Sequence, residues 1–183
     1  SLTERLREVL KKVEDTLRKL SERLRDVLRK AEKTIEEISR RSEEANRETK
    51  ERAERLMEEN RDERVIRKLE EVVRRSTKLV RDVDRRNKKV LRDVRELVKK
   101  VNEENKKVLK EAREKVDELS RLTDKDRIED VIRELDRLLE EVRRINEEVL
   151  RRIEELIKRV KEENDRVMET SRRLIETVKE EVK

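Results

Sequence analysis

Apolar residues recur along the chain at successive spacings of 4, 3, 4, 4 and 3 residues. In the first third of the sequence the pattern returns to the same phase at Leu2, Leu20, Ile38 and Leu56, so five steps cover 18 residues. The resulting period of 3.60 residues per turn is that of an unstrained α-helix. A heptad repeat would instead impose a left-handed supercoil. We therefore expect long, nearly straight helices that barely coil around one another.

The repeat is first broken at residues 59–63, and capping residues stand at the break. We expect Asn60 to take the left-handed C-terminal cap position of one helix and Asp62 to cap the start of the next. At the beginning of the chain, Ser1 and Glu4 have the spacing of a capping box.

The second break lies at residues 122–126. Here either Thr123 or Asp124 is expected to be the N-cap, and a contact of Leu122 with Ile128 would act as a hydrophobic staple. Turns this short place consecutive helices antiparallel. The fold class predicted is all-α, an up-down-up antiparallel three-helix bundle that forms a single domain over residues 1–183. Its helices are expected at about 2–59, 63–121 and 125–182.

The inward face of the first predicted helix carries one stripe, and we find no second apolar stripe on the outer faces. A bundle with such faces is expected to be a monomer, because nothing apolar is left for a further partner. The stripe of the first helix comprises Leu2, Leu6, Val9, Val13, Leu17, Leu20, Leu24, Val27, Ala31, Ile35, Ile38, Ser42, Ala45, Thr49, Ala53 and Leu56.

Polar residues enter the stripe at matching heights on the three helices. Folding the chain back at its two turns places two Thr-Asn-Asn layers 18 residues apart. A buried amide needs partners for its donor and its acceptor, so these layers are interpreted as hydrogen-bond networks that fix helix register. Replacing Asn87 alone with Leu is expected to be costly, because it would leave the facing Asn164 unpaired. The layers are Thr16, Asn105 and Asn146, and Thr34, Asn87 and Asn164.

A third polar region lies toward the first turn, where residues 39–55 contain no Leu, Ile or Val. Small side chains there allow two arrangements. The helices pack closely around a Ser/Thr network that includes Ser42, Ser76 and Ser171, or they leave a groove near residues 42–53 for a partner helix or a ligand. The other polar residues of this region are Ser39, Asn46, Thr49, Thr77, Thr170 and Thr177.

Charged residues make up 57% of the chain, and the 55 basic and 49 acidic side chains are interleaved. Many acids stand four residues before a base, as in Glu8 and Lys12, an arrangement that supports helices and solubility. Although the net charge is +6, the sequence shows neither a one-sided basic face nor aromatic residues for stacking on bases. We therefore expect neither nucleic acid nor a membrane as partner. A soluble chain without a natural compartment is expected, which would stay in the cytoplasm on recombinant expression.

Candidate chemistry is sparse, because the chain contains no His, Cys or Tyr. Most nucleophilic and acid–base catalysis relies on these residues, and zinc sites need His or Cys. The abundant carboxylates stand at exposed helix positions, and no Gly-rich loop is present to hold phosphate groups. The sequence thus predicts no enzyme, no catalytic residues, no metal site and no cofactor.

The chain contains no Gly, Pro, Cys, His, Phe, Tyr, Trp or Gln. This restricted composition, the 4-3-4-4-3 stripe and the two polar layers together resemble parametrically designed helical bundles with an untwisted 18-residue geometry and buried hydrogen-bond networks. The resemblance covers the whole chain. It implies a structural scaffold of high thermal stability, and some members of this class serve as modules for heterodimers or assemblies.

Three functions follow from these observations as hypotheses. The first is a designed scaffold without natural activity, in which the buried polar networks specify register. The second is a helix-binding or self-associating module that uses the groove near Ser42 and Ala53. A natural coiled-coil or spectrin-like fragment is the third, but it would predict aromatic residues, Gln and a heptad drift, none of which the sequence shows.

Overall fold

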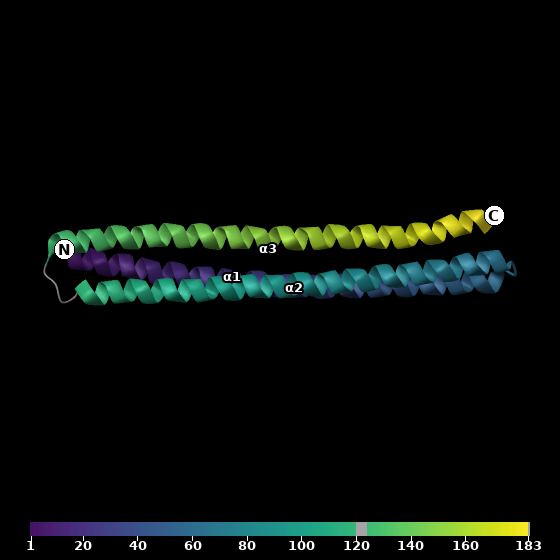
Figure 1. The fold of residues 1–183 in the computed structure, drawn as a ribbon, viewed down its shortest axis with the longest axis horizontal. Coiled ribbons are helices and arrows are strands. Elements are labelled where there is room, and N and C mark those ends of the chain that lie inside the picture. The colour runs from purple at the N-terminus through teal and green to yellow at the C-terminus, as the bar shows by residue number, and fades with distance from the viewer. Residues whose placement is uncertain (120–123, 183) are drawn as a thin grey trace. The chain divides into compact units, whose positions relative to one another are not determined.

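The computed structural model describes residues 1–119 and 124–182, and it contains three long helices that pack against one another. They are α1 (Leu2–Glu59), α2 (Glu63–Leu119) and α3 (Lys125–Val182), as Figure 1 shows. The predicted all-α three-helix bundle is confirmed. The predicted extension of the second helix to residue 121, the alternative cap Thr123 and the contact of Leu122 with Ile128 lie outside the described residues.

The 18-residue repeat is also a repeat of burial. None of the sixteen inward positions predicted for α1 is exposed. In α2 the equivalent positions Leu69, Asn87 and Asn105 are all buried, and in α3 so are Asn146 and Asn164. The predicted stripe is therefore confirmed, because equivalent positions of the repeat turn toward the other helices whether they carry an apolar or a polar side chain.

Polar side chains cap the start of each helix. The amide of Glu4 donates to Ser1 Oγ at 3.3 Å, and the amide of Arg64 donates to Asp62 Oδ1 at 3.0 Å. At the start of α3, the amide of Asp126 donates to Asp124 Oδ1 at 3.0 Å. These bonds satisfy amides that have no partner within the first turn of a helix, so the predicted caps Ser1 and Asp62 are confirmed. Asp124, one of the two alternatives for α3, acts as a cap.

The end of α1 differs from the prediction. Asn60 was expected to adopt a left-handed backbone, yet the described residues include none with positive φ. Instead, Asn60 Nδ2 donates to the carbonyl of Leu56 at 2.8 Å. The side chain thus satisfies one of the carbonyls that the last turn leaves unpaired, and the backbone avoids the strain of the left-handed region.

The internal contacts divide the chain into two compact units, each of which takes a segment from all three helices. The first unit comprises Ser1–Lys30 and Asp93–Glu154, and the second comprises Ala31–Arg92 and Glu155–Lys183. The single domain expected from the sequence stays a prediction.

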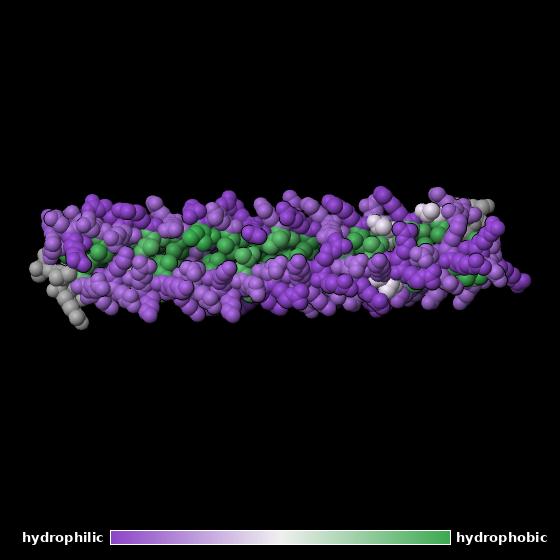
Figure 2. Space-filling view, in the orientation of Figure 1, coloured by the Kyte–Doolittle hydropathy of each residue, from purple (hydrophilic) through white to green (hydrophobic). Residues whose placement is uncertain are grey.

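The cores of the two units differ in composition. In the first unit, one cluster joins large aliphatic side chains of all three helices, among them Leu17 and Leu135. The second unit has a small cluster around Ile35 and Val160 and another around Leu69, Ala53 and Ile175. Figure 2 shows apolar side chains recessed between charged helix surfaces.

Candidate functional site

Asn105 of α2 and Asn146 of α3 form a reciprocal pair inside the first unit. Asn105 Nδ2 donates to Asn146 Oδ1 at 2.9 Å, and Asn146 Nδ2 donates to Asn105 Oδ1 at 3.0 Å. Asn146 is fully buried, and its Nδ2 also donates to the carbonyl of Val142 at 2.8 Å. The pair therefore gives the nitrogen and the oxygen of both amides a hydrogen-bond partner, as buried polar groups require.

Thr16, the third member expected in this layer, lies elsewhere. It is half-buried, and within the described residues it makes no hydrogen bond to either asparagine. Thr16 and Asn146 are 130 residues apart in the sequence, whereas Arg23 and Glu147, which touch between α1 and α3 of the same unit, are 124 apart. A difference of six residues corresponds to about 9 Å along a helix. Thr16 is therefore too far along α1 to complete the layer.

The second predicted layer is rearranged as well. Asn164 Oδ1 accepts a hydrogen bond from Ser42 Oγ of α1, and Asn164 Nδ2 lies 3.5 Å from the sulfur of Met168. Thr34, expected at the height of Asn164, is only half-buried. The offset between α1 and α3 again explains the difference, because Ser42 is 122 residues before Asn164 whereas Thr34 is 130 before it.

Asn87 is buried in the second unit, with 4% of its surface exposed. Its side-chain Nδ2 has no hydrogen-bond partner. Among the described residues, it is the one buried side-chain nitrogen or oxygen atom that lacks a partner. The expected pairing of Asn87 with Asn164 is therefore not formed. A buried donor without a partner costs free energy, so this position needs an explanation.

The region near the first turn contains both of the arrangements that the sequence left open. Ser76 of α2 is fully buried, donates to Asn46 Oδ1 at 3.1 Å, and has its Oγ 3.3 Å from Ser171 Oγ of α3. Thr49 is buried and bonds the carbonyl of Ala45 in its own helix, and Ala53 is fully buried. The inward side is therefore closely packed around a Ser/Asn network. Thr170 and Thr177 are exposed and bond carbonyls of their own helix.

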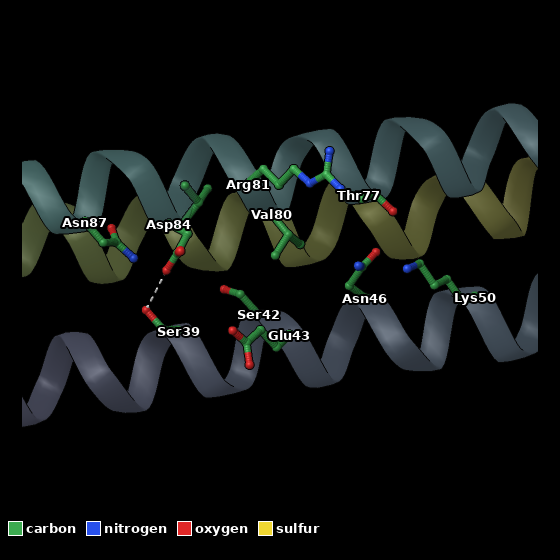
Figure 3. A pocket seen from close by; sticks show the side chains of 11 residues that line it. Ser39, Ser42, Glu43, Asn46, Lys50, Thr77, Val80, Arg81, Asp84 and Asn87 are labelled. Atoms are coloured by element: carbon green, nitrogen blue, oxygen red, sulfur yellow. Dashed lines mark hydrogen bonds between the residues drawn. The ribbon is translucent and has the colours of Figure 1, made fainter.

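Beside this packed core, an open cavity of about 260 Å³ lies between α1 and α2 of the second unit. Figure 3 shows Asn87 and Asp84 at one end, with Asn46, Thr77 and Lys50 toward the other. Ser39 Oγ donates to Asp84 Oδ1 at 3.2 Å across the cavity. The nitrogen of the Asn87 amide lies on the side of the residue that faces Asp84.

A second cavity, of about 550 Å³, shares Lys50, Thr77 and Arg81 with the first. Five of its eight lining residues are cationic and one is acidic. The cations of α2 follow one helix face at spacings of 4, 3 and 4, a signal that is present in the sequence but was hidden by the even mixture of charges in the whole chain. The lining residues are Lys50, Val73, Arg74, Thr77, Lys78, Arg81, Asp82 and Arg85.

Ion pairs between helices accompany the buried contacts. In the first unit, Arg23 of α1 forms a two-point contact with Glu147 of α3, in which the Nη2–Oε2 distance is 3.4 Å. The hydrogen bond with Arg23 lowers the pKa of Glu147, and the same bond raises the pKa of Arg23. Both side chains are about half exposed, so the pair contributes little to stability.

The described residues contain no group of three or more His, Cys, Asp or Glu side chains that could hold a metal ion. Within the same residues, no helix is both long and apolar enough to cross a membrane. Comparisons with protein-family models, with curated proteins and with solved structures find no match for this chain.

Proposed function

We propose that this chain is a designed structural scaffold without natural enzymatic activity, in which buried Ser and Asn hydrogen bonds specify how the helices align. The reciprocal bond between Asn105 and Asn146 carries this proposal. Two buried amides satisfy each other only at one relative height of α2 and α3. A slip by one turn, about 5.4 Å, would leave both without partners.

The residues that stabilise the bundle differ from those that specify the alignment of its helices. Large aliphatic side chains such as Leu17, Leu135 and Leu139 exclude water, but a stripe that repeats every 18 residues packs nearly as well after a slip.

The buried positions one turn from the pair are Val101, Val142 and Leu150, so a slip by one turn would place apolar side chains opposite Asn105 and Asn146. The role of the Asn pair is thus to disfavour alternative alignments.

Distances between spin labels test this proposal, because the chain has no cysteine and accepts a pair of labels without background. Labels are attached to Lys106→Cys on α2 and Arg127→Cys on α3, both exposed positions of the first unit. Arg127 is 18 residues, about 27 Å along α3, from the position that faces Lys106, so a slip changes the label-to-label distance directly. We expect one narrow distance distribution. Replacing Asn105 and Asn146 together with Leu should add distances shifted by about one helical turn, while the protein stays folded.

A matched control is Thr16→Val, which removes a half-buried hydroxyl that has no bond to the Asn pair. This variant should keep the single distance. If the double Leu variant also keeps it, the Asn pair does not specify the alignment and the proposal is wrong.

A helix-binding module near Ser42 and Ala53 is the alternative function. Ser42, Thr49 and Ala53 are themselves buried, and the open cavity beside them measures about 260 Å³. One turn of a helix about 10 Å wide fills roughly 400 Å³, which is more than this cavity holds. The adjoining cavity of about 550 Å³ has a single apolar lining residue, Val73, so it offers no apolar stripe to a docked helix. The small volume of the first cavity and the polar lining of the second favour the scaffold. A concentration-dependent dimer in light scattering would favour the module instead.

A further inference from the structure

We propose that the groove between α1 and α2 of the second unit binds a phosphorylated sugar or polyol. The phosphate would lie between Lys50 and Arg81, and the hydroxyl groups would extend toward Asp84 and Asn87. The observation that points to a ligand is the buried Asn87 amide, which lines the cavity and has no partner for its Nδ2.

The end of the groove at Lys50 and Arg81 suits an anion. These two residues line both cavities, and Figure 3 shows the Lys50 ammonium directed toward Asn46 and the Arg81 guanidinium extending toward Thr77. Among the described residues neither takes part in an ion pair, and the same holds for Lys78 and Arg85 in the adjoining cavity. Four cations that form no ion pair therefore line this end, and they outnumber the carboxylates of Glu43 and Asp82 in the two cavities. A phosphate would find net positive charge and hydrogen-bond donors there.

The opposite end offers groups that bind hydroxyls. Asp84 accepts from Ser39 and forms an ion pair with Lys88 at 3.2 Å, so its charge is already balanced while its oxygens can still accept hydrogen bonds. Asn87 Nδ2 needs an acceptor. The nitrogen itself is buried, and because the amide torsion of Asn is broad, a rotation of the amide would bring this donor to the cavity when a ligand binds.

A hydroxyl group matches this pair of requirements, because it accepts from Asn87 while donating to Asp84. A hydroxyl therefore matches this site better than an ammonium group, which donates only and leaves Asn87 unpaired. Arg81 and Asn87 are six residues apart on α2, about 9 Å along the helix axis. A hexose phosphate spans most of this length, and the side chains of Val80 and Val83 would contact the apolar face of its ring.

The test is a titration of the full chain, labelled with ¹⁵N, with glucose 6-phosphate, with inorganic phosphate and with glucose at about 0.15 M salt, where long-range charge effects are screened. We expect shifts of amide signals around residues 39–50 and 77–87, and glucose 6-phosphate should bind at least about tenfold more tightly than either fragment. Lys50→Gln and Arg81→Gln should each weaken the binding of both glucose 6-phosphate and phosphate. Asn87→Ala should weaken the binding of glucose 6-phosphate and leave the binding of phosphate unchanged.

The matched control is the pair Lys99→Gln and Lys106→Gln in the first unit, which removes exposed cations away from the groove. It should leave binding unchanged. The proposal is overturned if this control weakens binding as much as Lys50→Gln and Arg81→Gln do together, if phosphate binds as tightly as glucose 6-phosphate, or if no signals shift. Lys50 and Arg81 lie at the surface of the groove, so their variants keep the core intact and each result remains interpretable.

Discussion

Asn105 and Asn146 bind each other through two hydrogen bonds of 2.9 and 3.0 Å, and both side chains are buried. Either residue alone would be a liability in the core. Together they form a closed unit, since each amide supplies the acceptor that the other needs.

Single and double substitutions at this pair should therefore have different effects on the free energy of unfolding. Asn105→Leu or Asn146→Leu leaves a buried amide without its partner and should lower the free energy of unfolding by about 1 to 3 kcal/mol. The double Leu variant should be as stable as the parent or more stable. Guanidinium unfolding of all four proteins gives the coupling energy, and additive effects of the two substitutions would contradict the pairing.

Asn87→Leu should behave in the opposite way from Asn105→Leu. The sequence suggested a large cost through the loss of a partner for Asn164, but Asn164 is bonded by Ser42 and the Asn87 donor is unpaired. Removing that donor should raise the free energy of unfolding by about 1 kcal/mol. Ser42→Ala is the companion variant. It should lower the free energy of unfolding, because it removes the hydrogen bond that Ser42 donates to Asn164. A stability loss in Asn87→Leu as large as in Asn105→Leu would show that Asn87 has a partner after all.

The contact of Glu147 with Arg23 predicts a small pH dependence. Because the pKa of Glu147 is lowered in the folded chain, its contribution is present above the unfolded-state pKa of about 4.3 and is lost as pH falls through the lower folded value. Glu147→Gln should reduce the free energy of unfolding at pH 7 by less than about 1 kcal/mol. At pH 2 the variant and the parent should unfold at the same denaturant concentration, and a difference that persists there would rule out ionisation as its source.

Asn60 provides a test of the turn between α1 and α2. Asn60→Gly should lower the free energy of unfolding by about 0.5 to 1 kcal/mol, because it removes the bond to Leu56 and adds freedom to the unfolded chain. In a left-handed cap, Gly would be as good as Asn or better. Asp62→Ala is expected to cost about 1 kcal/mol through the loss of the bond from the Arg64 amide.

The proposed monomer can be tested at Ile145, which is 37% exposed and is the one exposed large apolar side chain among the described residues. Ile145→Lys should leave the mass measured by light scattering unchanged at every concentration. A parent chain that dimerises and a variant that does not would identify Ile145 as part of an interface.

The helices and their inward faces could be predicted from the sequence because each depends on local information. Spacing alone identifies the stripe from Leu6 to Ala53, and the side chains of Ser1 and Asp62 mark helix starts through bonds within one turn. Long-range alignment is different. The relation of α1 to α3 depends on two turns in succession, so an error of a few residues at each turn adds up.

That accumulated error explains why Thr16 and Thr34 do not join their predicted layers. Asn105 and Asn146, on helices joined by a single turn of the chain, were paired correctly, whereas Thr34 was assigned to the height of Asn164, which binds Ser42. Hydrogen bonds tolerate a displacement of less than 1 Å, but one residue along a helix is about 1.5 Å. The pairing of Asn87 with Asn164 was wrong for a different reason, because Ser42 donates to the acceptor oxygen of Asn164. The cationic groove could not be predicted for another reason. The net charge of the whole chain does not reveal a local excess of cations on one face of α2.

The polar core of the second unit has a consequence for how the chain opens. Between Ser39 and Arg55, α1 contributes only Ser, Thr, Asn and Ala to an interior that elsewhere holds Leu, Ile and Val, and the adjoining cavity reduces packing further. Less apolar area is buried per turn there, so fluctuations that break the backbone hydrogen bonds of this segment require less free energy. Amide protons of residues 39–55 should therefore exchange with deuterium well before those around Leu17 and Leu135. A repeat that is uniform in geometry would thus give a chain whose resistance to unfolding is graded along its length.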